Sequence, residues 1–187
     1  MSVILSPRND GKAIRCGQSQ KRRSVDMKRP ICHEAGHVVA ALHLGFRVER
    51  IDVQRGIPRS LIAMDCTREM MVVLASGIAA ERLVFGDYDV EGSTDDQKKI
   101  SECGGGAIEN YLVEACDIIR SNECCVRRLR ERLTQRWIES QAESEASSNF
   151  HSDSCSLTFD LMSGEDIEAI WAEAALGRSA PADRPDS

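Results

Sequence analysis

The sequence predicts a mainly α-helical fold with a small β-hairpin beside its first helix. Several segments carry apolar residues at helical spacing and end at glycine, whereas only residues 46–64 show the near-alternation of paired strands. The length of 187 residues and the hydrophobic share of 42% suit one domain with tails. A compact stretch of about 150 residues could bury roughly two-thirds of its unfolded surface, so the core needs no metal or disulfide.

The first helix and the hairpin are expected next to each other in the chain. Pro30 fits a first helical turn, and Ile31–Leu44 then continues without a strong breaker until Gly45. Phe46–Gln54 carries Val and Ile in near-alternation. The residues Arg-Gly-Ile-Pro interrupt it before a second apolar run, Ser60–Met64, so a pair of strands is predicted.

Two further helices are predicted on either side of a polar loop. Thr67–Phe85 is apolar around most of its circumference and is followed by Gly86, which is typical of a central, buried helix. Thr94 is followed three residues later by Gln97, and this capping-box pattern predicts a new helix. Gly104–Gly106 should interrupt that helix.

The remaining third of the chain alternates between helical and polar patterns. Tyr111–Glu139 is strongly helical and fits either one long helix or a charge-laced helical hairpin. Gln141–Ser156, rich in Ser and Glu, is expected to form a loop. A last helix is predicted from Ser163 through Trp171.

Charge divides the chain into a leader, a domain and a tail. Residues 1–30 hold eight Lys or Arg and two Asp, a net charge of +6, so the rest must carry −12 to give the total of −6. Residues 1–28 are expected to be a disordered basic leader, 29–173 the folded domain and 174–187 a disordered tail. Arg22, Arg23, Lys28 and Arg29 could contact nucleic acid or acidic lipid, but an acidic folded part does not favour nucleic acid as the partner.

Other patterns bear on the compartment. The longest apolar run, Met70–Ala80, is far shorter than the roughly 20 residues that span a bilayer. The first residues lack the charge order of a secretory signal. The eight cysteines follow no regular spacing, so reduced, mostly packing thiols and a cytoplasmic location are expected; they are Cys16, Cys32, Cys66, Cys103, Cys116, Cys124, Cys125 and Cys155.

The pattern His-Glu-Ala-Gly-His at residues 33–37 is the strongest chemical signal. On a helix, His33 and His37 are turned only about 40° from each other, so both imidazoles can reach one metal ion. Zinc accepts nitrogen and oxygen ligands and leaves a position for water, and Glu34 could take that water's proton as a general base. A peptide carbonyl is the expected target of the resulting nucleophile.

Three residues compete for the place of a further metal ligand. His43 follows His37 by six residues, but Ala40 occupies the position where the metzincin pattern needs a glycine turn, so His43 should point away. Glu81, in an apolar helix, could bind the metal directly, orient a ligating histidine, or pair with an arginine. Asp96 stands in the first turn of a helix, where acidic residues are also favourable to the helix dipole.

A family resemblance separates these candidates. The chain carries HEAGH, then LASGIAAERLVFG, then EGSTDDQ, a charged helix and LMSGEDI, in that order. This series resembles the peptidase domain of FtsH-type zinc metalloproteases from about Arg29 to Trp171. The resemblance implies a helical zinc-peptidase domain in which His33, His37 and Asp96 bind Zn²⁺ and Glu34 is the catalytic base.

The resemblance also implies a function and its limits. It implies a soluble zinc metalloendopeptidase that acts on unfolded or flexible polypeptide. FtsH-type proteins also carry membrane helices and an ATPase module, and this sequence has no GxxxxGK[ST] loop, so an ATPase of another chain or a homo-oligomer would have to feed substrate. The short strands predict a reduced substrate groove. The alternative is a non-catalytic metal-binding or partner-binding domain that regulates a membrane or cytosolic protease complex.

Overall fold

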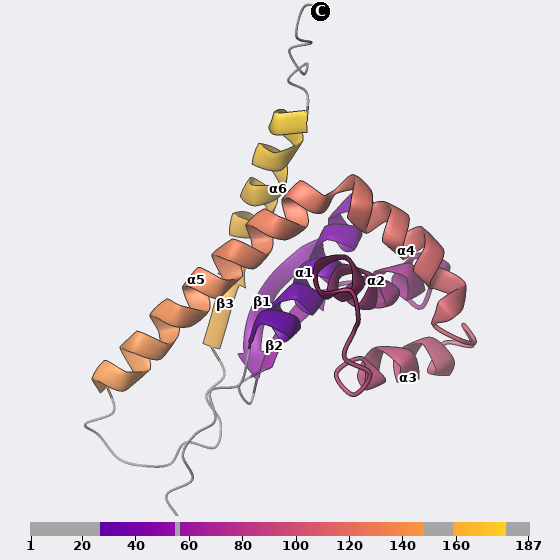
Figure 1. The fold of residues 1–187 in the computed structure, drawn as a ribbon, viewed down its shortest axis with the longest axis horizontal. Coiled ribbons are helices and arrows are strands. Elements are labelled where there is room, and N and C mark those ends of the chain that lie inside the picture. The colour runs from indigo at the N-terminus through magenta and orange to yellow at the C-terminus, as the bar shows by residue number, and fades with distance from the viewer. Residues whose placement is uncertain (1–26, 55–56, 148–158, 179–187) are drawn as a thin grey trace, which may run out of the picture.

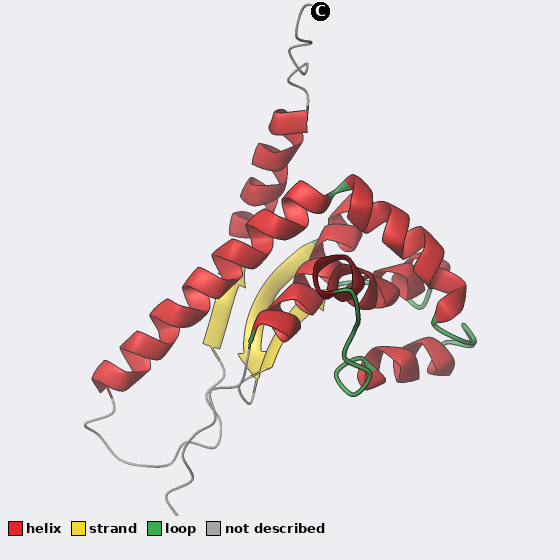
Figure 2. Ribbon diagram, viewed as in Figure 1, coloured by secondary structure: helices red, strands yellow, loops and turns green. Residues whose placement is uncertain are grey.

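The computed structural model describes residues 27–54, 57–147 and 159–178, which form six helices and a three-stranded sheet (Figure 1, Figure 2). The elements are α1 (Lys28–His43), β1 (Val48–Gln54), β2 (Ile57–Ile62), α2 (Arg68–Phe85), α3 (Thr94–Glu102), α4 (Glu109–Ser121), α5 (Glu123–Ser147), β3 (Phe159–Ser163) and α6 (Gly164–Arg178). The predicted mainly helical fold is therefore confirmed. Residues 1–26 of the expected leader and the end of the tail lie outside the described residues, whereas Met27 is buried and Lys28 begins α1, so the leader ends earlier than the predicted residue 28.

The sheet contains one strand more than the predicted hairpin. Its order is β2-β1-β3, with both neighbours antiparallel to β1, so β2 is an outer strand. Ile57 and Pro58 belong to β2, although the sequence pattern placed them in the break between the strands. β3 pairs with β1 from more than a hundred residues away in the chain. Such long-range pairing leaves no local signal, which is why two strands instead of three were predicted.

α2 is the central helix of the fold, as its apolar pattern predicts. Eleven consecutive residues from Met71 to Glu81 are buried, and the helix packs against α1 on one side and α4 on another. Thr67 caps its start by accepting a hydrogen bond from the Met70 N–H, and Gly86 caps its end. Gly36 lets α1 come close to α2, because a Cβ there would collide with the Ser76 carbonyl oxygen.

Three predictions concern the segment from α3 to α5. Thr94 lies inside α3 and Ser93 precedes it, so the predicted capping box is wrong; the Gln97 amide instead donates to the Ser93 hydroxyl. The expected interruption by Gly104–Gly106 is confirmed. Asn122 then separates α4 from α5, so Tyr111–Glu139 is not one long helix.

The last two helices both run further than the sequence pattern indicates. α5 continues to Ser147, so the first part of the predicted loop at 141–156 is helical, while 148–158 lies outside the described residues. α6 continues to Arg178, past the expected boundary at residue 173, and Ala174 is buried in the core. α5 packs against α1 as well as against β3 and α6 (Figure 1).

A disulfide corrects the expectation that all cysteines are reduced. Cys66, just before α2, is bonded to Cys103, just after α3, with the two Cα atoms 6.0 Å apart. The bond therefore ties the end of α3 to the start of α2. Among the described residues, Cys32, Cys116, Cys124 and Cys125 form no disulfide, and Cys16 and Cys155 lie outside the described residues.

Within the described part of the chain, none of the helices has the length and apolar character needed to cross a membrane.

Candidate metal centre

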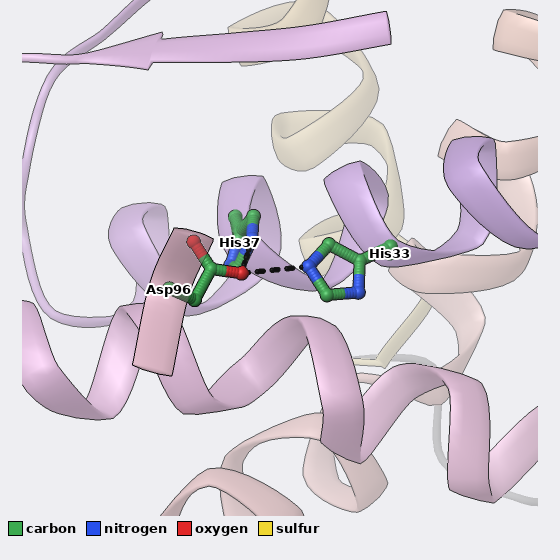
Figure 3. A group of neighbouring side chains, drawn as sticks. All are labelled: His33, His37 and Asp96. Atoms are coloured by element: carbon green, nitrogen blue, oxygen red, sulfur yellow. Dashed lines mark hydrogen bonds and ion pairs between the residues drawn. The ribbon is translucent and has the colours of Figure 1, made fainter. Parts of the chain in front are cut away.

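Two turns of α1 and the first turn of α3 bring three side chains to one point. His33 and His37 are buried, with 7% and 6% of their surface exposed, and their rings lie 4.6 Å apart at right angles. Asp96, 8% exposed, faces both rings from α3 (Figure 3). Its Oδ2 atom lies 2.8 Å from Nε2 of His33 and 3.2 Å from Nε2 of His37.

The second nitrogen of each ring is held by another group, and this decides which nitrogen is free to bind. Nδ1 of His37 lies 2.8 Å from the Val73 carbonyl oxygen. A carbonyl oxygen only accepts, so this Nδ1 carries the hydrogen. Nδ1 of His33 lies 2.7 Å from Oε1 of Glu81, and an ionised carboxylate likewise accepts. In the neutral rings, both Nε2 atoms therefore turn a lone pair toward Asp96.

The electrostatics of the cluster favour a positive charge at its centre. Burial disfavours the charged form of His33, but hydrogen bonds to Asp96 and Glu81 outweigh it and raise the pKa of His33 to about 10. Burial would raise the pKa of Asp96, but the charge of His37 and the hydrogen bonds from both histidines hold that pKa far below its usual range. Two lone pairs and a carboxylate oxygen thus converge where a proton or a cation must lie between them.

The donor set suits a metal ion. One ligand atom from each of His33, His37 and Asp96 can be chosen so that all three lie within 4.8 Å of one another, and all three residues are buried. Two imidazole nitrogens and a carboxylate oxygen are ligands that zinc and several other transition metals accept. This group could therefore hold a metal ion, and the donors alone do not specify which one.

Glu81 supports the site from behind His33. It is 2% exposed, and its Oε2 accepts hydrogen bonds from the Asp89 N–H at 2.8 Å and from Arg29 at 3.4 Å. Of the three roles open to Glu81 in the sequence, the structure shows contact with the ring nitrogen of His33 that faces away from Asp96, together with an arginine pair. These bonds offset the cost of burying its charge.

Gly77 of α2 provides the space for the His33 ring. A Cβ at this position would lie 2.5 Å from Nε2 of His33. A side chain at position 77 would therefore push the ring away from Asp96. Gly77 belongs to the LASGIAAERLVFG block that carries the family resemblance, but its contact with His33 could not be predicted from that pattern.

The other residues considered from sequence lie elsewhere or have other partners. His43 is exposed at the end of α1, where its Nδ1 lies 3.2 Å from the Asn122 amide nitrogen, and it does not belong to the cluster. Arg29 pairs with Glu81 and Asp87, so its charge is already engaged within the chain. Arg22 and Arg23 lie outside the described residues.

Glu34 lies beside the cluster and faces the outer strand β2. Its Oε2 accepts two hydrogen bonds from Ser60, one from the backbone N–H at 2.7 Å and one from the hydroxyl at 2.6 Å. Both residues line a pocket of about 180 Å³ that also reaches the three cluster residues. Its apolar walls come from β2, the segment after it and α2, namely Ile57, Ile62, Met64, Val73 and Leu74.

No family model and no curated protein matches the chain. Its function must therefore be argued from the site itself, together with the ordered motifs of its sequence.

Sequence reasoning identified His33, Glu34, His37 and Asp96, and the structure brings all four to one pocket. It missed the residues that hold them in place. The Val73 carbonyl is a backbone group that any residue type would offer, and Ser60 stands in an ordinary strand pattern. Only the placement of α2 and β2 beside α1 reveals these contacts.

Proposed function

We propose that the protein is a zinc metalloendopeptidase that hydrolyses peptide bonds in unfolded or flexible polypeptide, as its resemblance to the FtsH-type peptidases implies. The observation that carries this proposal is the convergence of His33, His37 and Asp96 beside Glu34 in one pocket. A purely structural metal site would have no need of an additional carboxylate next to its ligands. The buried cluster supports metal binding in general, and zinc is the choice that the HExxH pattern favours.

His33, His37 and Asp96 would hold the zinc ion through Nε2, Nε2 and a carboxylate oxygen. Zinc, when bound, would supply a Lewis acid that polarises the scissile carbonyl and lowers the pKa of a water molecule to about 7. Glu34 would accept the proton of the attacking water and pass it to the leaving amine. The Glu81 carboxylate and the Val73 carbonyl would keep both rings oriented throughout.

The pocket is suited to an extended chain with apolar side chains. β2 is an outer strand and contributes Ile57, Pro58, Arg59, Ser60 and Ile62 to its wall. Apolar lining beside a polar centre is the usual composition of a substrate site. A folded protein would not present a strand-like segment here, which is why flexible polypeptide is the proposed substrate.

The proposal is tested by metal analysis and by the Glu34→Gln variant. Purified protein should contain one zinc ion per chain. Glu34→Gln should still bind zinc but lose casein cleavage by roughly 100-fold or more, because the amide cannot accept the proton. Glu109→Gln, which changes an exposed glutamate at the start of α4, serves as the control and should cleave casein like the wild type.

Two results would contradict this function. A metal content well below one per chain would remove its basis. Full zinc occupancy with equal cleavage by the wild type and Glu34→Gln would favour the alternative, a metal-binding domain that regulates a protease complex without turnover.

A further inference from the structure

Ser60 makes an unusual double contact with the side chain of Glu34. The two residues are 26 positions apart and come from different elements, β2 and α1. Ser60 donates both its N–H and its hydroxyl to the same oxygen, Oε2, at 2.7 and 2.6 Å. Hydrogen bonds to a carboxylate are short and about twice as strong as neutral ones. The contact therefore fixes one oxygen of Glu34.

The other oxygen of Glu34 is left available. Among the described residues, none donates a hydrogen bond to Oε1 of Glu34. The side chain is half-buried and lines the same pocket as His33, His37 and Asp96. A glutamate in such a place would otherwise turn about several single bonds, and ordering it costs conformational entropy. The two hydrogen bonds from Ser60 of β2 to Oε2 restrict the Glu34 side chain before substrate binds.

We propose that Ser60 is a positioning residue, which holds Oε2 of Glu34 so that Oε1 is directed to the water that attacks the peptide bond. The inference rests on the proposed peptidase function and adds a residue to it. Proton transfer depends on a donor–acceptor geometry held within a few tenths of an ångström, so a loosened base should slow the chemical step. Because the Ser60 hydroxyl is already donated to Glu34, its loss should act on kcat and not on substrate binding.

The experiment compares Ser60→Thr with Ser60→Val in the full-length chain, using a quenched fluorescent peptide as substrate. Threonine and valine have the same shape and both suit a strand, but only threonine carries the hydroxyl. Ser60→Val should lower kcat about tenfold, while KM, zinc content and the melting temperature stay near their wild-type values. Ser60→Thr should restore at least half of the wild-type kcat.

Further variants keep the test decisive. Ser60→Ala retains the N–H bond but lacks the hydroxyl, so its kcat should also fall, and it replaces Ser60→Val if the latter does not fold. Ser101→Ala removes an exposed hydroxyl from α3 and should leave all four measurements unchanged. A merely structural role of Ser60 would instead lower the melting temperature and raise KM in every variant.

The outcomes separate this inference from the proposed function. If wild-type cleavage depends on Glu34 but kcat is unchanged in Ser60→Val and Ser60→Ala, the positioning role is overturned and the peptidase function stands. A loss of kcat that threonine does not restore, or that follows zinc content, also overturns it. If wild type and Glu34→Gln cleave equally, the peptidase proposal falls and the role of Ser60 falls with it.

Discussion

Oε1 of Glu81 lies 2.7 Å from Nδ1 of His33, the ring nitrogen that does not face Asp96. The bond joins α2 to α1 across the buried interface and fixes both the orientation and the tautomer of the ring. The metal affinity of the cluster should thus depend on a residue that does not touch the metal.

Glu81→Gln should weaken zinc binding by roughly tenfold, since an amide is a poorer acceptor for the His33 N–H and supporting partners of this kind contribute 10–100-fold. Competition with a chromophoric chelator measures the affinity. Glu109→Gln is the matched control, because this glutamate is exposed at the start of α4. Equal affinities for Glu81→Gln and the wild type would contradict the supporting role.

Gly77→Ala should weaken zinc binding clearly, while the free energy of unfolding should change little. The added methyl would lie 2.5 Å from Nε2 of His33 and displace the ring, whereas alanine itself is about 1 kcal/mol more favourable than glycine in a helix. Gly36→Ala is the contrasting variant, because its methyl meets the backbone of Ser76. In urea unfolding, Gly36→Ala should lose more free energy of unfolding than Gly77→Ala. The opposite order would contradict the roles given to the two glycines.

Removal of the Cys66–Cys103 disulfide should lower the free energy of unfolding by about 3–4 kcal/mol, the value expected when a loop of this length is no longer closed in the unfolded chain. Urea unfolding of the Cys66→Ser, Cys103→Ser double variant measures the change. Cys124→Ser, which alters a free and partly exposed thiol, is the control. Because the bond holds the end of the helix that carries Asp96, zinc affinity should fall in the double variant as well.

Cys32 should be nearly inert to iodoacetamide in the native protein. Burial raises the pKa of its thiol from 9.0 to about 11, so little thiolate is present at pH 8. Mass spectrometry should find the partly exposed Cys116 and Cys124 labelled before Cys32, and Cys32 labelled only after denaturation. Because the folded state holds this proton more tightly, Cys32 contributes stability that is present below pH 9 and lost as the pH rises toward 11. Rapid native labelling of Cys32 would contradict this view of the core.

The parts of the fold that sequence predicted are those with a local physical signal. α1 ends near Gly45, and α2 combines an apolar surface with a threonine cap, so both could be placed within a few residues. β3 has only five residues and depends on pairing with β1, which no local pattern encodes. The disulfide joins cysteines 37 positions apart without a known spacing pattern, so it too depends on the three-dimensional arrangement.

The candidate site divides in the same way. His33, Glu34 and His37 are fixed by the turn of one helix, whereas Asp96 was chosen from three candidates by resemblance and not by geometry. Gly77 stood in the motif block of the resemblance, but the supporting contacts of Val73, Gly77 and Ser60 could not be predicted from the sequence. Each involves a backbone group, an absent side chain or a strand placement, and none of these has a characteristic residue pattern.

The outer strand β2 also affects how copies of the chain meet. An exposed strand edge is a template on which a second copy can pair, and its unpaired N–H groups are the donors for that pairing. The N–H of Ser60 points away from β1 and is already bonded to Glu34, while Pro58, two residues earlier on the same side, has no N–H at all. The contact that holds the proposed base thus removes one donor where proline removes another, and this edge should resist the edge-to-edge association that leads to aggregation.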